Sequence, residues 1–152
     1  MSRHPKNIAL FGGSFNPPHE GHREIVRRVT RRKGIDEVWI LPVWRHPFRK
    51  KLPMFKKRVA ACRRFFPSPL KIKTYEHRPG STGRTVDLLL YLTKRFPRYR
   101  FWWVMGGDAY RQRTKWKDFP KIRKLARLVV FPRGPRSPIP NLASRKLRRK
   151  AC

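Results

Sequence analysis

Short apolar runs alternate with helix-like stretches along most of the chain, and this alternation constrains the fold more than any other feature. We expect strands at residues 8–11, 38–41, 70–75, 101–105 and 128–131. The connections between these runs are too long for hairpins, so the strands are expected to run parallel, with helices as crossovers. The sequence therefore predicts an α/β fold, a doubly wound, parallel, five-stranded sheet with helices on both faces.

Three of the connecting stretches carry apolar residues at the spacing of one helix face, and in a fourth Asp118 can cap a helix that tolerates Pro120 in its first turn. We expect helices at residues 20–33, 55–66, around 86–90, and 118–126. Thr85 and Asp118 stand at the start of the last two. Because Thr and Asp commonly cap helix N-termini, we expect both side chains to act as N-caps.

The length of 152 residues suits one domain with its own core. We expect residues 1–152 to form a single domain in which residues 132–152 are a Pro-rich, basic C-terminal tail. No run approaches the ~20 apolar residues of a membrane span, and the N-terminus does not resemble a secretory signal. Cys62 and Cys152 give neither a disulfide framework nor a metal-ligand spacing. We therefore expect a cytoplasmic protein with no membrane partner.

The charge balance is unusual, because 40 Lys and Arg stand against 8 Asp and Glu, a formal net charge of +32. Residues 119–152 contain no acidic residue. Such a surface attracts polyanions and raises the local concentration of anionic ligands. Nucleic acid is therefore an expected additional partner, although the charge alone does not identify the main function.

Residues 12–22, GGSFNPPHEGH, form the most informative stretch. They directly follow the first predicted strand, and open parallel sheets bind ligands beyond the carboxyl ends of their strands. Glycines let backbone N–H groups approach a ligand closely, and the start of the next helix favours an anion. The stretch is neither the GxxxxGK[ST] phosphate loop nor the GxGxxG dinucleotide motif.

His19 and His22 lie three residues apart at the predicted helix start. Imidazole N–H groups donate hydrogen bonds to phosphoryl oxygens and stabilise charge that develops during transfer, and Gly21 leaves room for a phosphate between the rings. The alternative is a turn whose histidines cap the helix or bind a metal. Because glycines, histidines and the helix start coincide in one loop, we favour a phosphate site.

This stretch resembles the motif of the T/HxGH nucleotidyltransferases, and further motifs resemble the nicotinate-nucleotide adenylyltransferases among them. The similarity covers nearly the whole chain, and the motifs occur in the family's order. They are Gly12–His22; Trp39–Pro42 with His46–Lys50, similar to a strand and PPHK loop; Phe55–Val59, similar to F-x-x-R; Thr85–Leu89, similar to T-x-D-T-L; Gly106–Ala109, similar to G-[SA]-D-[AN]; Trp116; and Leu142–Arg148, a shortened and degenerate match to I-S-S-T-x-I-R. The resemblance implies a Rossmann-like fold.

The resemblance also implies an activity, the transfer of an adenylyl group from ATP, with Mg²⁺, to nicotinate mononucleotide. The products are nicotinate adenine dinucleotide and pyrophosphate. It implies catalytic roles at the ATP phosphates for His19, His22 and Arg148. It implies substrate-binding roles for Gly12, Gly13, Ser14 and Phe15 through their backbone, and for Gly21, Lys50, Thr85, Gly107, Asp108, Trp116 and Ser144. Among these, Asp108 is expected at a ribose, and Thr85 and Trp116 at the pyridine ring.

Two other interpretations remain open. A related enzyme could keep the transfer and use another acceptor: nicotinamide mononucleotide, a pantetheine phosphate, or a sugar or alcohol phosphate. A protein of another class could bind RNA or DNA through its +32 charge on a catalytically weakened nucleotidyltransferase fold. His19, Gly21, His22 and Asp108 argue against the second interpretation, because a pure binding protein has no use for that arrangement.

Overall fold

The computed structural model describes residues 4–44 and 54–132. These residues form the strands β1 (Asn7–Gly13), β2 (Glu37–Pro42), β3 (Lys71–Ile72), β4 (Arg100–Gly106) and β5 (Arg127–Phe131). The helices are α1 (Glu20–Thr30), α2 (Phe55–Phe65), α3 (Thr85–Arg95), α4 (Gly107–Arg111) and α5 (Phe119–Leu125). A short 3₁₀ helix, η1 (Arg113–Lys115), follows α4.

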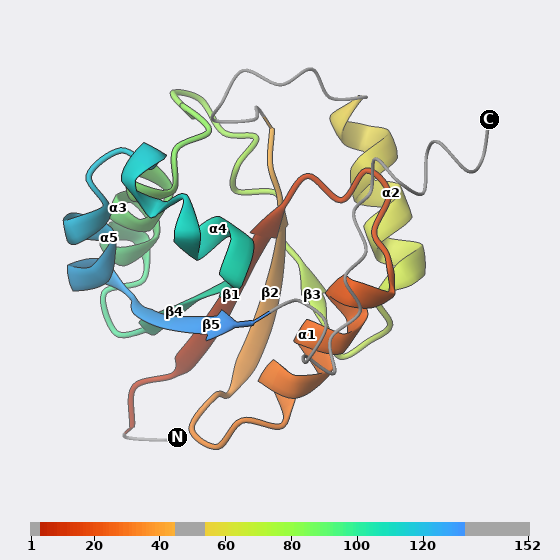
Figure 1. Cartoon of the computed structure of the whole chain (residues 1–152), viewed down its shortest axis with the longest axis horizontal. Coiled ribbons are helices and arrows are strands. Elements are labelled where there is room, and N and C mark those ends of the chain that lie inside the picture. The colour runs from red at the N-terminus through yellow and green to blue at the C-terminus, as the bar shows by residue number, and fades with distance from the viewer. Residues whose placement is uncertain (1–3, 45–53, 133–152) are drawn as a thin grey trace.

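The strands form one sheet in the order β3-β2-β1-β4-β5, and every strand pair in the described ranges is parallel. Figure 1 shows this sheet with helices on both sides. α1 and α2 pack on one face, and α3 and α5 pack on the other. The predicted doubly wound, parallel, five-stranded sheet of Rossmann-like type is therefore confirmed.

The central strand β1 contributes to two separate cores, because successive side chains of a strand point to opposite faces. Ile8 and Leu10 pack with residues of α3 and α5. Ala9 and Phe11 pack with residues of α1 and α2. A strand buried on both faces is apolar at every position, which is why β1, β2 and β4 appear in the sequence as continuous apolar runs.

Two predicted elements extend more than one residue beyond the observed ones. The strand expected over residues 70–75 pairs only at Lys71–Ile72, because the chain turns at Thr74, whose carbonyl accepts the His77 N–H at 2.9 Å. The first helix ends at Thr30 rather than at residue 33. The chain then turns toward β2 through Gly34, which has a left-handed φ of +95° that favours glycine.

The two predicted N-caps are wrong in detail. Arg84, not Thr85, is the N-cap residue of α3, and its backbone N–H donates to Thr82 Oγ1 at 3.2 Å. Thr82 Oγ1 in turn donates to Asp87 Oδ2 at 2.5 Å, so an upstream hydroxyl organises the first turn. Asp118 does occupy the N-cap position of α5, but with a φ of +50° its side chain makes no capping hydrogen bond to the described residues.

None of the helices in residues 4–44 and 54–132 has the length and apolar character needed to cross a membrane. Cys62 is a buried free thiol on α2, and burial raises its pKa to about 12, so the inert, protonated form prevails. Cys152 and nearly all of the predicted tail at residues 132–152 lie outside the described residues.

Candidate active site

The neighbouring strands β1 and β4 define a topological switch point, because the chain leaves them on opposite faces of the sheet. β1 ends at Gly13 and β4 ends at Gly106, so both carboxyl ends lie at this point. α1 begins at the same edge of the sheet, and the N-terminus of a helix carries partial positive charge. The loop with the predicted phosphate site therefore lies where a sheet of this topology binds its ligand.

The residues directly after β1 are held by aromatic packing. A Cβ at Gly12 would lie 2.8 Å from Cη2 of the buried Trp103, so close packing requires a glycine here. Phe15 is 1% exposed, and its ring packs edge-on against Phe11 at a centroid distance of 5.7 Å. Because the Phe15 ring belongs to the core, only the backbone of Phe15 can make its predicted contact with a substrate. The Phe15 backbone has a left-handed φ of +48°.

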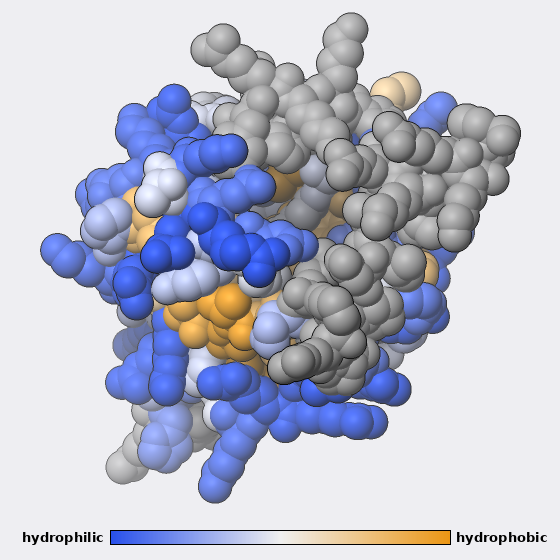
Figure 2. Space-filling model, in the orientation of Figure 1, coloured by the Kyte–Doolittle hydropathy of each residue, from blue (hydrophilic) through white to orange (hydrophobic). Residues whose placement is uncertain are grey.

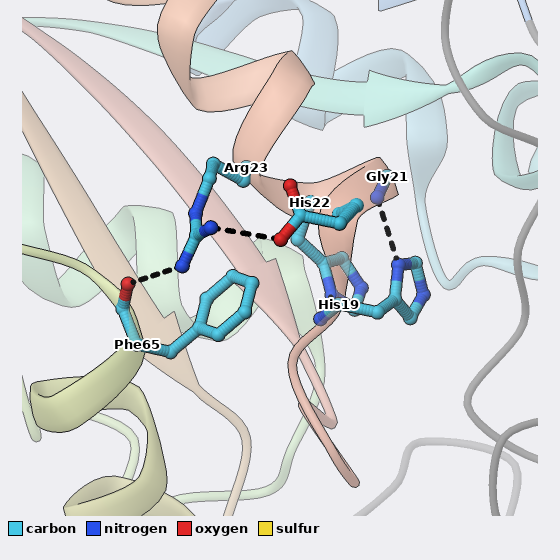
Figure 3. Close-up of polar contacts among 6 residues, drawn as sticks. His19, Gly21, His22, Arg23 and Phe65 are labelled. Atoms are coloured by element: carbon cyan, nitrogen blue, oxygen red, sulfur yellow. Dashed lines mark hydrogen bonds and ion pairs between the residues drawn. The ribbon is translucent and has the colours of Figure 1, made fainter.

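His19 and His22 hold the start of α1 through reciprocal hydrogen bonds. His19 is the N-cap residue, and its Nδ1 accepts the Gly21 N–H at 3.1 Å (Figure 3). His22 Nδ1 accepts the His19 N–H at 3.0 Å. The two rings stack with their centroids 3.7 Å apart. The arrangement is a capping box in which imidazoles take the places of the usual hydroxyl and carboxylate.

These hydrogen bonds determine which ring nitrogen carries the proton. A nitrogen that accepts an N–H is unprotonated, so a neutral ring holds its proton at Nε2. His19 and His22 therefore each carry an Nε2–H donor in addition to the Nδ1 acceptor that caps the helix. From the sequence, helix capping and phosphate binding were alternative interpretations of these histidines. The structure makes them compatible, because capping uses Nδ1 and phosphate binding would use Nε2–H.

The first turn of α1 is supported from two sides. The His22 ring packs edge-on against Phe15 at a centroid distance of 4.9 Å. Arg23 donates to Glu20 Oε1 at 2.8 Å and to the Phe65 carbonyl at 3.2 Å, which links α1 to the end of α2 (Figure 3). The orientation of the imidazole pair is thus fixed by packing and by hydrogen bonds.

Arg58, the arginine of the F-x-x-R motif at Phe55–Val59, ties the site loops together, although it is not among the predicted site residues. Its buried Nη1 donates to the carbonyl oxygens of Ser14 at 3.1 Å and Val43 at 2.7 Å, which follow β1 and β2. Burial lowers the pKa of its guanidinium. A signal exists in the sequence, because Arg58 lies three residues after Phe55 and four before Cys62, within the apolar stripe of α2.

Thr85 and Trp116 line the same pocket, which has a volume of about 380 Å³. The Trp116 indole packs edge-on against Trp103 and Phe119, at centroid distances of 6.4 and 6.3 Å, so its orientation is fixed. Three cationic residues also line this pocket, namely Arg84, Lys115 and Lys117. An aromatic wall, a hydroxyl and positive charge together suit an aromatic anion.

The remaining predicted residues divide into two groups. Gly107 and Asp108 begin α4 directly after β4, at the switch point, and the Asp108 carboxylate pairs with Arg111. Neither Gly107 nor Asp108 is among the described residues that line the Thr85–Trp116 pocket. Three predicted residues, Lys50, Ser144 and Arg148, lie outside the described residues, so their roles stay predictions.

Comparison with known proteins identifies the family of this chain. A family model described as cytidylyltransferase-like matches residues 10–150, so the chain belongs to the cytidylyltransferase-like proteins. Two relatives are each named "Probable nicotinate-nucleotide adenylyltransferase". The protein of Myxococcus xanthus is 42% identical over 130 residues, which cover 84% of this chain and 68% of the relative. The protein of Anaeromyxobacter dehalogenans is 36% identical over 144 residues, which cover 89% and 75%. Within that class, the chain belongs to the nicotinate-nucleotide adenylyltransferase family.

Solved structures support the same fold. The nicotinic acid mononucleotide adenylyltransferase of Plasmodium falciparum, complexed with NaAD, superposes with a TM-score of 0.76 at 20% identity, over 95% of this chain and 83% of that one. The same enzyme complexed with APC superposes with a TM-score of 0.72 at 22% identity, over the same shares. At this level of identity the likeness concerns the fold.

Proposed function

We propose that this chain transfers the adenylyl group of ATP to nicotinate mononucleotide, which forms nicotinate adenine dinucleotide and releases pyrophosphate. The observation that carries the proposal is the stacked pair of His19 and His22, held by the start of α1 at the β1–β4 switch point. The relatives named for this activity and the fold shared with an enzyme complexed with NaAD support it.

In the proposed reaction, an oxygen of the acceptor's 5′-phosphate attacks the α-phosphorus of ATP. The bond from the α-phosphorus to the bridging oxygen breaks, and pyrophosphate leaves with that electron pair. No protein nucleophile is needed, so the protein acts by positioning both substrates and stabilising charge on the α-phosphoryl oxygens. The Nε2–H donors of His19 and His22 supply this stabilisation, with His22 nearest to the α-phosphoryl group.

The Thr85–Trp116 pocket is the proposed acceptor site. The Trp116 indole offers its face to the pyridine ring, and the Thr85 hydroxyl donates to the ring carboxylate. The surrounding cations Arg84, Lys115 and Lys117 favour nicotinate, which is anionic, over neutral nicotinamide. Asp108, at the start of α4, is the proposed ribose contact.

Mg²⁺ enters the proposal as part of the MgATP substrate. The imidazole and backbone N–H groups at the β1–β4 edge are donors that suit phosphate oxygens, whereas Mg²⁺ prefers oxygen ligands. The ATP phosphates therefore hold the ion. Lys50 and Ser144 are proposed to contact the phosphates, and Arg148 to hold the β- and γ-phosphates as a bidentate fork.

An acceptor screen tests the proposal. The full chain is supplied with MgATP and, separately, nicotinate mononucleotide, nicotinamide mononucleotide or phosphopantetheine, and pyrophosphate release is measured. We expect the fastest release with nicotinate mononucleotide and no release when either substrate is omitted. Faster release with another acceptor would assign the chain to a related nucleotidyltransferase, and no release with any acceptor would contradict the proposed transfer.

A further inference from the structure

A second cavity lies at the opposite edge of the sheet from the His19–His22 pair. It has a volume of about 710 Å³ and is lined at the beginnings of three strands by Asn7, Arg100 and Arg127. The turn after α1 and the end of α5 complete it. β1 is seven residues long, so roughly 20 Å of strand separates this cavity from the switch point.

The cavity is lined by five cations, Lys33, Arg100, Arg123, Lys124 and Arg127, and we call it the basic groove. All five are exposed. No Asp or Glu is among the lining residues, and none of the five cations forms an ion pair within the described part of the chain.

Cations elsewhere on this surface differ, because carboxylates neutralise several of them. Glu37 pairs with both Lys6 and Lys71. Glu24 pairs with both Arg27 and Arg28. The Asp36 carboxylate accepts the Asn7 backbone N–H at 2.7 Å. The cations of the basic groove therefore differ from those around Glu24 and Glu37, because no carboxylate offsets their charge in the described part of the chain.

Hydrogen-bond and ring contacts hold the floor of the basic groove. Trp102 lies on β4, and its indole N–H donates to Asn7 Oδ1 at 3.0 Å. The guanidinium groups of Arg127 and Arg32 lie 4.7 and 5.6 Å from the Trp102 ring, so both cations are held against an aromatic surface. Figure 2 shows hydrophilic side chains around the lower left of the molecule, near the beginnings of β1, β4 and β5, beneath an apolar patch over β5.

We infer that the basic groove binds the phosphate backbone of single-stranded nucleic acid, at a site separate from the catalytic edge. Unpaired cations on several elements match a chain of phosphates, each of which releases counterions when it is neutralised. The cavity is far too small to admit a duplex. A lipid surface fits less well, because binding to a bilayer uses exposed apolar side chains, and the exposed large apolar residues of the described chain, Trp44, Met54, Leu90 and Val130, all lie outside the groove.

A matched pair of charge variants tests this inference. The groove variant carries Arg100→Gln, Arg123→Gln and Lys124→Gln. The control variant carries Lys56→Gln, Arg63→Gln and Arg64→Gln on α2, three exposed cations outside the groove, so both variants lose the same net charge. Binding of a short fluorescein-labelled oligouridylate is followed by fluorescence anisotropy between about 50 and 200 mM salt.

The groove variant is expected to bind about tenfold more weakly than the unaltered chain, and the slope of log K against log salt is expected to fall by about 2. The control variant is expected to change affinity less than about threefold. Equal losses in the two variants would show that only net charge matters, and the inference would be wrong. Tighter binding of the unaltered chain to phosphatidylserine vesicles than to the oligonucleotide would also overturn it.

A measurement on the unaltered chain does not depend on how the variants fold. Photo-crosslinking with an oligonucleotide that contains 4-thiouridine is expected to label peptides that include Arg100 and residues 123–127. Labelling confined to peptides around His19 and His22 would contradict a separate site. Pyrophosphate release by the groove variant is expected to match that of the unaltered chain, so failure of the inferred binding and failure of the proposed transfer are distinguishable.

Discussion

The two edges of the sheet present their polar groups in opposite ways. At the carboxyl edge, His19, His22 and Arg58 are engaged with backbone groups, so their geometry is set before a ligand arrives. At the amino edge, the cations of the basic groove are exposed and have no carboxylate partner in the described chain. Fixed donors suit one small substrate in one orientation, whereas exposed cations suit a long polyanion that requires charge more than geometry.

The direction of the strands accounts for much of this difference. In a parallel α/β fold the crossover helices begin at the carboxyl edge and end at the amino edge, where their C-termini carry partial negative charge. The last turns of α1, α3 and α5 each contain two basic residues: Arg27 and Arg28, Lys94 and Arg95, and Arg123 and Lys124. Cations are favourable at these positions, so the helix ends add positive charge to the edge away from the His19–His22 pair.

The largest expected effect comes from His22, where capping and charge stabilisation can be separated. His22→Ala removes both nitrogens, and we expect pyrophosphate release with nicotinate mononucleotide to fall by about 10²–10³-fold in kcat/KM. His22→Asn keeps an acceptor near the position of Nδ1 but lacks the distal N–H. His22→Gln offers an amide N–H near the position of Nε2.

We expect the Asn variant to match the thermal stability of the unaltered chain and to be as inactive as the Ala variant, because the donor is what the reaction uses. The Gln variant is expected to recover part of the activity. If His22→Asn is as active as the unaltered chain, the imidazole serves only as a helix cap, and the carboxyl edge loses its proposed donor.

Two carboxylates near opposite edges have pKa values shifted in opposite directions. Glu76 follows β3 and is buried, and its Oε1 lies 3.6 Å from Arg78 Nη1 without a hydrogen-bond partner of normal length among the described residues. Burial raises its pKa to about 7, against the opposing effect of Arg78 and with a small addition from Asp87. Glu37 begins β2, and although burial opposes the shift, hydrogen bonds from Lys6, Lys71 and Trp39 lower its pKa to about 2.

These two pKa shifts predict that the free energy of unfolding changes with pH in two separate ranges. Between pH 4.5 and 7 the unfolded chain releases the Glu76 proton while the folded chain retains it, so stability falls as pH rises. Glu76→Gln is expected to stabilise the chain at pH 8 by up to about 3 kcal/mol and to flatten this decline. Glu37 contributes stability above pH 4.5 that is lost as the pH falls toward 2, and Glu37→Gln is expected to flatten only this acid limb.

Urea unfolding at intervals from pH 2 to pH 8 measures stability in both ranges. The Glu37 variant is the matched control, because it also removes one carboxylate charge but acts at the other edge. A Glu76→Gln variant whose unfolding free energy keeps its full decline between pH 4.5 and 7 would show that this carboxyl group is solvated in the folded protein.

The sequence predicted those parts of the fold that depend on local pattern. β1, β2 and β4 are buried on both faces, so their apolar runs are continuous and easy to locate. β3 lies at the edge of the sheet and pairs through only two residues, so its alternating pattern overestimated its length. The first motif was informative because its glycines, histidines and helix start are adjacent in the chain.

Contacts that join distant segments were not predictable in the same way. Arg58 reaches Ser14 across 44 residues, and Arg23 reaches the Phe65 carbonyl across 42. The basic groove collects cations from residues 33 to 127, which only the folded topology brings together. The sequence does not show which ring nitrogen of His19 faces the helix. It therefore could not show that one ring can cap the helix and also bind a phosphate.

The smallest expected effects come from replacing one glycine at each edge of the sheet with alanine. Gly12, near the end of β1, lacks room for a Cβ, which would lie 2.8 Å from Trp103, the ring that supports Trp116 in the proposed acceptor pocket. Gly34, in the turn beside the basic groove, has nothing within 4 Å of a Cβ but has a φ of +95°. We expect Gly12→Ala to destabilise the chain by about 1–3 kcal/mol through overpacking, and Gly34→Ala by about 1 kcal/mol through backbone strain.

The kinetic result separates these two causes more sharply than the stability. Because displacement of Trp103 reaches Trp116, Gly12→Ala is expected to raise KM for nicotinate mononucleotide severalfold, whereas Gly34→Ala leaves KM unchanged. Thermal unfolding and steady-state pyrophosphate release on the same preparations provide both readouts. An unchanged KM in Gly12→Ala would mean that the Trp103 ring gives way without moving the pocket wall, and the acceptor site would then not depend on the packing at the end of β1.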